Sequence, residues 1–487
     1  MNDSSPIYDK YEAVIGLEVH IQLLTASKAY SSDSNEFGSM PNCNVSPITL
    51  GLPGTLPKAN KKVINFAVKL GLAIGADIRY ENQYARKNYF YADLPKGYQI
   101  TQDKTPICNG GIIEIKLKDQ APKRINITRI HMEEDAGKSM HDQDAFDSLI
   151  DLNRAGVPLL EMVSEPELSS GTEAYAYLNE VRKLLRYLEI CDGNMEEGSM
   201  RCDANVSVRI KGDTAFGKRV EVKNMNSVRN VQRAIEHEFT RQIDIIEKGG
   251  AINQETRSFD AVNGTTFSLR TKEMANDYRY FPEPDLAPVI VTENYIAEVK
   301  KQMPPLPHEL HQRFVNEMGL SEYDALIICD HKNFALYFNE LTKHTQNYKA
   351  AANWINGPVK SSLNERALEI EQFELSPIKI AEIIELVDQG AVSFSTASQK
   401  IFPALIANPT ANAQQLAESN NWIQSSDSGE LESFAKQAIE KFPTKVAEYR
   451  SGKTGLLGLF MGEVMKLSKG SADPKKASEI VKKMLEN

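Results

Sequence analysis

Two residue types that carry chemistry alternate near the start of the chain, in the stretch VIGLEVHIQL. The apolar Leu17 and Val19 alternate with Glu18 and His20, and this period of two predicts a strand with one buried face. Glu18 and His20 then lie side by side on the other face. Such a pair is either a solvated strand face or part of a metal or acid–base site, and these residues alone do not decide between the two.

Further carboxylates occur in apolar or glycine-bounded segments. Glu161 lies between large apolar residues in PLLEMV, Glu221 lies between two valines in RVEVKN, and acids recur in HMEEDAGK (131–138) and MEEGSMRCD (195–203). A carboxylate in apolar surroundings is costly unless it is paired or binds a metal. Together these acids favour a divalent-cation site, because Mg²⁺ prefers oxygen ligands, while His20 also allows Mn²⁺. Taken singly, each is equally explained as a partly exposed strand residue.

A metal among carboxylates without a nucleophile motif favours phosphoryl chemistry, in which positioning and charge neutralisation do most of the work. The usual nucleotide loops are absent. AGKS (136–139) and SGKT (451–454) resemble the end of a P-loop, but Met132 and Ala447 occupy the positions of its first glycine.

Aromatic side chains occur together with Arg86, Lys87, Asn88 and Lys96 in a loop that contains proline and glycine, RKNYFYADLPKGYQITQ (86–102). This mixture suits stacking on a base or on the end of a tRNA. A surface loop anchored by its own rings explains it equally well.

Length, composition and charge limit the classes of function. The chain has 487 residues, 41% hydrophobic and 25% charged, which predicts about two to four domains. No apolar run is long enough to span a membrane, no secretion signal is visible, and five separated cysteines suit a cytoplasmic enzyme. The net charge of −10 argues against coating nucleic acid by charge alone. Residues 444–487 carry nine Lys and Arg against five Asp and Glu, a local +4 that is either a solvated face or a polyanion contact.

The order of predicted elements gives the fold class. Strands at 125–134 and 200–210 and helices after Ser170 and Ser227 predict an α+β domain with a largely antiparallel sheet. Prolines then cluster in YFPEPDLAPVIV (280–291) and QMPPLPHEL (302–310), and almost only helical periodicity follows. A polar stretch at 406–415 is typical of a linker, so three domains are expected.

Long motifs, in one order through nearly the whole chain, closely resemble the GatB/GatE family, whose GatB members belong to the aspartyl/glutamyl-tRNA(Asn/Gln) amidotransferase. The motifs are VIGLEVHIQL, RKNYFYADLPKGYQITQ, HMEEDAGKS, DLNRAGVPLLEMVSEPEL, MEEGSMRCDANVSVR, SLRTKEMANDYRYFPEPDLAP, WINGPV and FMGEVMKLSKGSADP. The resemblance implies a cradle-like α+β catalytic domain (1–293), an all-α helical domain (294–407) and an all-α YqeY-like tail domain that binds tRNA (408–487).

The resemblance also implies an activity. The protein is expected to be a ligase that forms a carbon–nitrogen bond with glutamine as amido donor. It would phosphorylate the side-chain carboxylate of misacylated Asp-tRNA(Asn) or Glu-tRNA(Gln) with ATP. Ammonia from an amidase subunit, GatA, would then displace phosphate. A small belt subunit, GatC, would complete a cytoplasmic heterotrimer that needs no membrane.

The family's catalytic metal ligands fall on Glu18, His20, Glu134 and Glu161, with Glu221 as a further ligand. The expected ion is Mg²⁺, with Mn²⁺ as the alternative.

We assign Lys87, Asn88 and Tyr91 of the aromatic segment to binding of ATP.

One departure from the family concerns zinc. Many members carry four cysteines near the start that bind a structural zinc ion, and the matching positions here are Ser31, Asp33, Ser46 and Thr49. Four thiolates are missing, and Cys43 alone cannot replace them. We therefore expect no zinc, with the surrounding lobe held by packing alone.

Two rival interpretations remain open from the sequence. GatE shares this catalytic core but normally carries an inserted domain, for which the continuous match leaves no room. A tRNA-binding scaffold with a decayed kinase site is the other rival, and the retained Glu18, His20, Glu134 and Glu161 speak against it.

Overall fold

A computed structural model describes residues 7–141, 143–271, 278–424, 428–468 and 472–486. The chain divides into two compact units, Met1–Leu306 and Pro307–Asn487, which are described separately. Lys272–Asp277 of the motif SLRTKEMANDYRYFPEPDLAP and Lys469–Ser471 of FMGEVMKLSKGSADP lie outside the described residues. In the described part, no helix has both the length and the apolar character needed to cross a bilayer.

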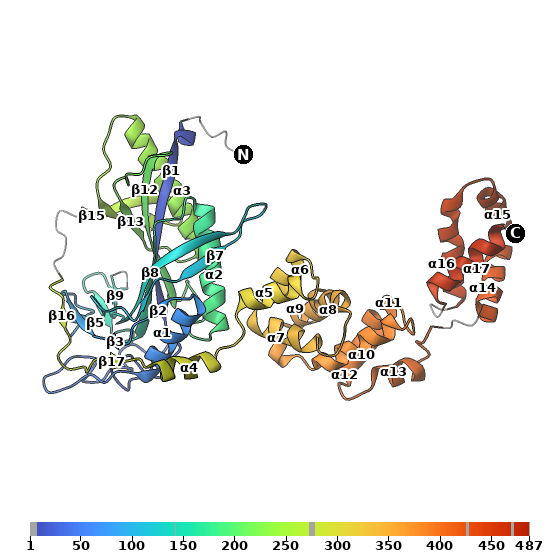
Figure 1. The fold of residues 1–487 in the computed structure, drawn as a ribbon, viewed down its shortest axis with the longest axis horizontal. Helices are drawn as coiled ribbons and strands as arrows, with labels where there is room; N and C mark the ends of the chain where they lie inside the picture. Colours follow the sequence, from blue (N-terminus) through green and yellow to red (C-terminus); the bar gives the residue numbers. More distant parts are fainter. Residues whose placement is uncertain (1–6, 142, 272–277, 425–427, 469–471, 487) are drawn as a thin grey trace. The chain divides into compact units, whose positions relative to one another are not determined.

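The first unit is built on a ten-stranded sheet (Figure 1). Its strand order is β15-β14-β13-β12-β1-β11-β8-β6-β2, with β7 paired to β8 beside this path. Neighbouring strands pair antiparallel except β13 with β14, which confirms the predicted α+β class with a largely antiparallel sheet. The strands are β1 (Tyr11–Gln22), β2 (Asp77–Ile78), β6 (Cys108–Asn109), β7 (Ile112–Ile115), β8 (Lys123–Glu134), β11 (Pro158–Ser164), β12 (Met200–Ile210), β13 (Val220–Lys223), β14 (Glu255–Asp260) and β15 (Thr265–Thr271).

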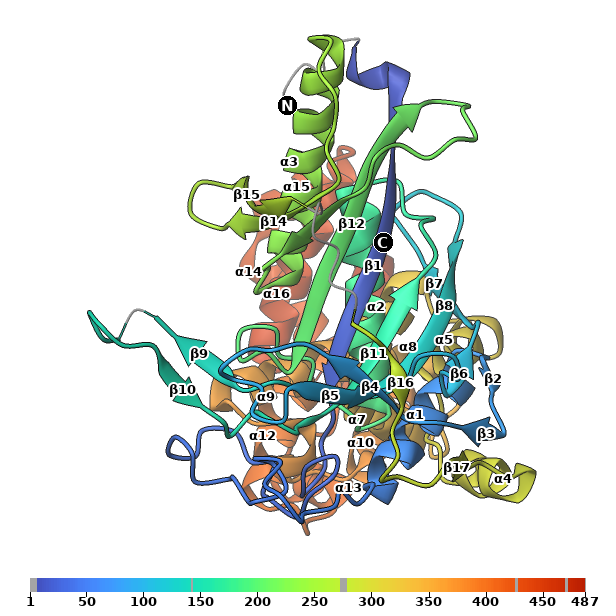
Figure 2. The same ribbon diagram turned by 90° about the vertical axis from the view of Figure 1, so that its left-hand side faces the viewer.

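The sheet has one apolar and one polar face because its central strands alternate. Leu17, Val19 and Ile21 of β1 are fully buried and share one core with the apolar side chains of helices α2 (Gly171–Tyr187) and α3 (Val228–Glu247). β1 and β12 run side by side over most of their length (Figure 2). The polar residues of both strands therefore face away from this core.

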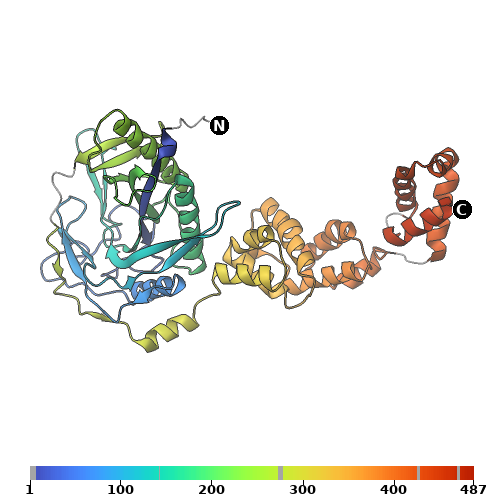
Figure 3. The same ribbon diagram turned by 45° about the horizontal axis from the view of Figure 1, so that its top comes forward.

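Both predicted helix starts are confirmed by their caps. The Ser170 hydroxyl accepts a hydrogen bond of 3.1 Å from the Glu173 amide, and the Ser227 hydroxyl accepts one of 3.1 Å from the Asn230 amide. These bonds satisfy donors that a helix start leaves without partners. Close by, β7 lies beside α2 (Figure 3).

Smaller pieces complete the first unit. Its remaining helices are α1 (Lys61–Ala73) and α4 (Glu293–Lys301). Three small sheets consist of β9 (Lys138–Met140) with β10 (Leu149–Asp151), β3 (Glu81–Asn82) with β17 (Val289–Ile290), and β4 (Ala85–Asn88) between β5 (Tyr98–Thr101) and β16 (Phe281–Pro282). The proline-rich segment thus contributes two strands here, and Val299 and Leu306 join the core of this unit.

The second unit is helical in its described residues. Its α-helices are α5 (Pro307–Asn316), α6 (Glu322–Cys329), α7 (Lys332–Leu341), α8 (Tyr348–Trp354), α9 (Lys360–Arg366), α10 (Pro377–Asp388), α11 (Phe394–Thr396), α12 (Phe402–Ala407), α13 (Ala413–Ser419), α14 (Ser428–Lys441), α15 (Pro443–Arg450), α16 (Leu457–Leu467) and α17 (Pro474–Glu486). Helix α13 packs against α10. Helices α14 to α17 enclose a core of their own, which includes Leu431, Phe460 and Val481. The division at 293 and 407 stays a prediction.

Candidate functional site

A row of ionisable side chains crosses four neighbouring strands on the polar face of the sheet. Arg201 of β12 lies opposite His20 of β1, His20 opposite Glu161 of β11, and Glu161 opposite His131 of β8. Directly opposed residues of antiparallel strands project from the same face. Four side chains that are far apart in the sequence are therefore brought side by side.

Two further acids lie next to this row. Asp203 of β12 faces Glu18 of β1, two residues from Arg201 and His20 respectively. Glu133 lies two residues beyond His131 on β8, so it projects from the same face. We call Glu18, His20, His131, Glu133, Glu161 and Asp203 the acid–histidine cluster.

His20 is at the centre of the cluster. Its Nδ1 lies 3.2 Å from Glu133 Oε1 and 3.9 Å from Glu161 Oε2, and its Nε2 lies 3.5 Å from Glu18 Oε1. His131 Nε2 lies 3.5 Å from Glu161 Oε2 and 3.7 Å from Glu133 Oε2. The two imidazoles thus share the same pair of buried carboxylates.

The pKa values express the electrostatics of the cluster. Burial acts to lower the pKa of His20, but its contacts with Glu133 and Glu18 outweigh burial and raise it well above its ordinary value. Burial acts to raise the pKa of Glu18, but His20 and Lys223 hold it at about 2. The pKa of Glu161 is raised by burial and by the nearby Glu133 and Glu18. The raised pKa of Glu161 thus reflects its burial and its crowding by other carboxylates.

The cluster fits a divalent cation by its donor set. Two overlapping triads, Glu18–His20–Asp203 and His20–Glu133–Glu161, each bring their ligand atoms within 4.8 Å of one another. Carboxylate oxygens suit Mg²⁺, and the imidazoles also admit Mn²⁺. In addition, His131 Nδ1 is buried without a hydrogen-bond partner among the described residues. A divalent cation would neutralise charge on these crowded carboxylates.

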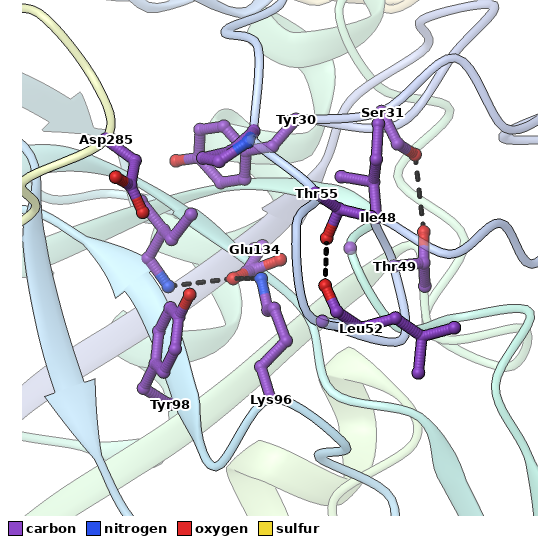
Figure 4. A pocket seen from close by; sticks show the side chains of 14 residues that line it. Tyr30, Ser31, Ile48, Thr49, Leu52, Thr55, Lys96, Tyr98, Glu134 and Asp285 are labelled. Carbon is purple, nitrogen blue, oxygen red and sulfur yellow. Dashed lines mark hydrogen bonds and ion pairs between the residues drawn. The ribbon is translucent and has the colours of Figure 1, made fainter.

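The structure brings Glu18, His20 and Glu161 together, as the sequence predicts, but it does not place Glu134 with them. Glu134 is next to Glu133 on β8 and points to the other side. Its carboxylate accepts a hydrogen bond of 2.8 Å from the Ile100 amide and pairs with Lys96. Figure 4 shows Glu134 beside Lys96 and Tyr98 in the wall of a separate pocket.

Glu221, the fifth predicted ligand, also lies apart from the two triads. On β13 it accepts a hydrogen bond of 2.8 Å from the Thr256 hydroxyl. Lys223 lies 3.3 Å from Glu221 and also pairs with Asp203. Glu221 is thus linked to the cluster through Lys223. Neither Glu134 nor Glu221 belongs to a ligand triad, so the metal site proposed below uses the cluster and not these two predicted ligands.

The three residues assigned to ATP occupy different positions. Burial acts to lower the pKa of Lys87, but Glu133 and other nearby groups raise it above its ordinary value. Asn88 donates hydrogen bonds of 3.2 and 2.8 Å to the carbonyls of Tyr278 and Arg279, so it fixes the returning chain. Tyr91 is exposed. Their role in binding stays a prediction.

Four tyrosines form a connected group at this edge, Tyr91, Tyr89, Tyr278 and Tyr280. Successive ring centroids are 5.8, 6.1 and 6.0 Å apart in edge-on contacts, and Lys87 Nζ lies 5.0 Å from the centre of the Tyr278 ring. The group combines ring faces with one cation, which suits stacking on a base.

Sequence reasoning did not single out His131, Glu133 or Asp203 as ligands. The sequence did contain an indication of their position, because His131 and Glu133 are two residues apart on a predicted strand, as Glu18 and His20 are. It likewise missed Tyr278 and Tyr280, whose approach to residues 88–91 depends on tertiary structure.

Ser31, Asp33, Ser46 and Thr49 meet in the structure and form a hydrogen-bonded group. The Asp33 carboxylate accepts a hydrogen bond of 2.9 Å from the Ser46 amide and a short one from the Thr49 hydroxyl. The Thr49 hydroxyl in turn lies 3.3 Å from the Ser31 hydroxyl. Burial opposes ionisation of Asp33, but these donors hold its pKa below the ordinary value. The expectation that packing alone holds this lobe is therefore wrong, since a charge-assisted group at these positions contributes as well.

We expect Asp33→Ala to loosen this loop. Hydrogen bonds to a charged acceptor contribute about 1.5–3 kcal/mol, so amide exchange in peptides covering residues 44–52 should accelerate about tenfold or more. Asp144→Ala is the control in a separate, exposed turn, where Asp144 Oδ1 accepts hydrogen bonds from the Phe146 and Asp147 amides. Equal exchange in wild type and Asp33→Ala would contradict the prediction.

The zinc prediction concerns the same positions. Elemental analysis of the purified chain should give far less than one zinc per chain, because the four side chains contain one carboxylate and no thiolate. A stoichiometric zinc content would mean that other residues have been recruited as ligands.

Comparison with known proteins follows the same division of the chain. Residues 13–297 match the GatB/GatE catalytic domain, and residues 336–485 match the GatB domain. Proteins named as the B subunit of aspartyl/glutamyl-tRNA(Asn/Gln) amidotransferase are similar over almost the whole chain. The one from Thermodesulfovibrio yellowstonii is 47% identical over 98% of this chain and 99% of its own length. The one from Trichlorobacter lovleyi is 48% identical over 98% of this chain and 99% of its own length. The one from a Synechococcus species is 46% identical over 100% of both chains.

Proposed function

This chain belongs to the GatB/GatE family, and from that premise we propose that it is the GatB component of a tRNA-dependent amidotransferase. Its substrates would be Asp-tRNA(Asn), Glu-tRNA(Gln) or both, with ATP as phosphoryl donor and glutamine as source of ammonia. The observation that carries the proposal is the acid–histidine cluster, on the polar face of the catalytic unit. GatA and GatC are the proposed partner subunits, and a cytoplasmic location follows from tRNA substrates.

The reaction has two steps. A side-chain carboxylate oxygen of the misacylated tRNA attacks the γ-phosphorus of ATP, and the bond to the β–γ bridging oxygen breaks with its electron pair going to ADP. Ammonia then attacks the carboxyl carbon, and phosphate leaves with the electrons of the carbon–oxygen bond. The nitrogen loses a proton and an amide remains. A carboxylate resists ammonia, so the first step supplies the leaving group.

The chain's residues divide this work. Glu18, His20, Glu133, Glu161 and Asp203 are the proposed ligands of Mg²⁺ or Mn²⁺. The ion, when bound, would neutralise charge on the approaching phosphate and carboxylate.

Lys87 would keep a positive charge at the edge of the cluster. The tyrosine group beside it would stack on adenine, which both ATP and the 3′ end of tRNA carry.

Reconstitution with the partner subunits tests the proposal. The complex should convert at least one of Asp-tRNA(Asn) and Glu-tRNA(Gln) to the amide with glutamine, and only when ATP is present. Correctly charged Asn-tRNA and Gln-tRNA should stimulate no ATP hydrolysis, because they lack the carboxylate. A complex that amidates neither misacylated tRNA would contradict the proposed function.

A further inference from the structure

Arg201 is the basic residue aligned most directly with the acid–histidine cluster. It lies opposite His20 in the β1–β12 register, and Asp203 is two residues further along the same strand. Its guanidinium therefore belongs to the polar face that carries the cluster. The proposed metal ligands and the tyrosine group do not include it.

The guanidinium is anchored from outside the cluster. Arg201 Nη2 donates a hydrogen bond of 2.6 Å to Asp135 Oδ2. Asp135 is itself buried, and its Oδ1 accepts a hydrogen bond of 2.9 Å from the Ala136 amide. Arg154 Nε lies 3.6 Å from its Oδ2. Asp135 is thus a fixed acceptor that sets the orientation of the arginine.

The anchor leaves hydrogen-bonding capacity unused. A guanidinium has five N–H donors, and within the described ranges that of Arg201 donates one hydrogen bond, to Asp135. Its Nε is buried and has no partner there, although 33% of the side chain is exposed. Buried polar atoms normally have partners, so an unpaired donor next to an open part of the same group points to a missing anion.

The other basic side chains near the cluster have different partners. Lys223 pairs with Asp203 of the cluster and with Glu221 beside it, and Arg129 Nη2 lies 3.9 Å from Glu161. Lys87 lies over the Tyr278 ring. Arg201 differs from Lys223 and Arg129 because its partner, Asp135, is not a member of the cluster.

We infer that Arg201 is a catalytic residue that binds the γ-phosphoryl group of ATP during its transfer to the substrate carboxylate. This inference rests on the proposed function. As the bond from phosphorus to the bridging oxygen breaks and the bond from the carboxylate oxygen forms, negative charge stays on the non-bridging oxygens. A planar guanidinium can donate to two of these oxygens at once, and its fixed orientation avoids reorganisation during the step.

The expected effect is selective for the transition state. Arg201→Ala should slow amidation by about a hundredfold or more with the affinity for ADP changed by less than about threefold. Arg201→Lys should not restore the rate, because an ammonium cannot donate in the same planar fork. Arg201→Gln retains a donor for Asp135 and serves as the variant with the least disturbance of folding.

The test is equilibrium binding by the complete complex, with misacylated tRNA and Mg²⁺, of ADP alone and of ADP with aluminium fluoride. The second probe mimics the phosphoryl group in transfer, so wild type should bind it about tenfold or more tightly than ADP. Arg201→Ala and Arg201→Gln should lose this preference. Arg209→Ala is the matched control on the same strand, with its Nε 2.5 Å from Glu12 of β1, and should keep both the preference and the rate.

Two outcomes would overturn the inference. One is that the Arg201 variants amidate at the wild-type rate. The other is that they weaken ADP and ADP with aluminium fluoride equally, which would mean that Arg201 only balances the charge of Asp135. Failure of the wild-type complex to amidate either tRNA would contradict the proposed function instead. The amidation assay distinguishes this result from an effect of the Arg201 variants.

Discussion

Replacing Glu161 by glutamine is expected to lower amidation of misacylated tRNA by about a hundredfold or more and to weaken Mn²⁺ binding by a similar factor. Glu161 is buried, lies within 3.9 Å of His20 and 3.5 Å of His131, and belongs to one of the two ligand triads. The glutamine side chain keeps the shape but loses the charge that a divalent cation needs. Electron paramagnetic resonance measures Mn²⁺ binding directly, without relying on turnover.

Glu134→Gln supplies the matched control for metal binding. Glu134 is as buried as Glu161, but its carboxylate pairs with Lys96 and the Ile100 amide in a different pocket. Its substitution should leave Mn²⁺ affinity within about twofold, whereas Glu133→Gln should behave as Glu161→Gln does. Unchanged Mn²⁺ affinity in Glu161→Gln would contradict the assignment of the cluster as the metal site.

Removing four charges from the last helix is expected to weaken tRNA binding by about tenfold or more. Lys475, Lys476, Lys482 and Lys483 are exposed on α17, and their spacing of seven residues places them along one side of the helix, away from the buried Val481. No ion pair joins them to another described residue. They are therefore available for phosphates, and the quadruple glutamine variant tests this in the complete complex.

Salt dependence distinguishes phosphate contacts from a general loss of fold. If all four lysines contact phosphates, the slope of log affinity against log salt should become shallower by about 3 to 4. Lys441, Lys445 and Lys453 form the control set, because each is paired with Glu463 or Glu448 in the same tail. The corresponding triple glutamine variant should change the slope much less. Equal slopes for wild type and the α17 variant would mean that these lysines form a solvated face.

The central strands were predictable because their alternation is a local property. Glu18 and His20 occupy one face of β1 in the structure, as their period of two indicates. The same rule, applied to β8, places Glu133 and His131 on one face and Glu134 on the other. The family resemblance assigned the metal to Glu134, and the alternation of the strand distinguishes it from Glu133.

The remainder of the site depends on tertiary structure. The alignment of Arg201 with His20 and Glu161 follows from strand order and register, which join segments about 180 residues apart in the chain. The contact of Tyr278 with Tyr89 likewise depends on the pairing of β16 with β4. The hydrogen-bonded group around Asp33 could not be predicted either, because it forms only where two loops meet in the folded chain. Residue types alone carry none of this information.

In the proposed reaction, the substrate carboxylate becomes an acyl phosphate before ammonia attacks it. The most direct measurement uses misacylated tRNA whose side-chain carboxylate is labelled with ¹⁸O, incubated with the complete complex, ATP and glutamine. Each amide formed should release one phosphate that contains one ¹⁸O atom, because the carboxylate oxygen that attacked phosphorus leaves with it. Phosphate without ¹⁸O, released while amide accumulates, would contradict an acyl phosphate intermediate.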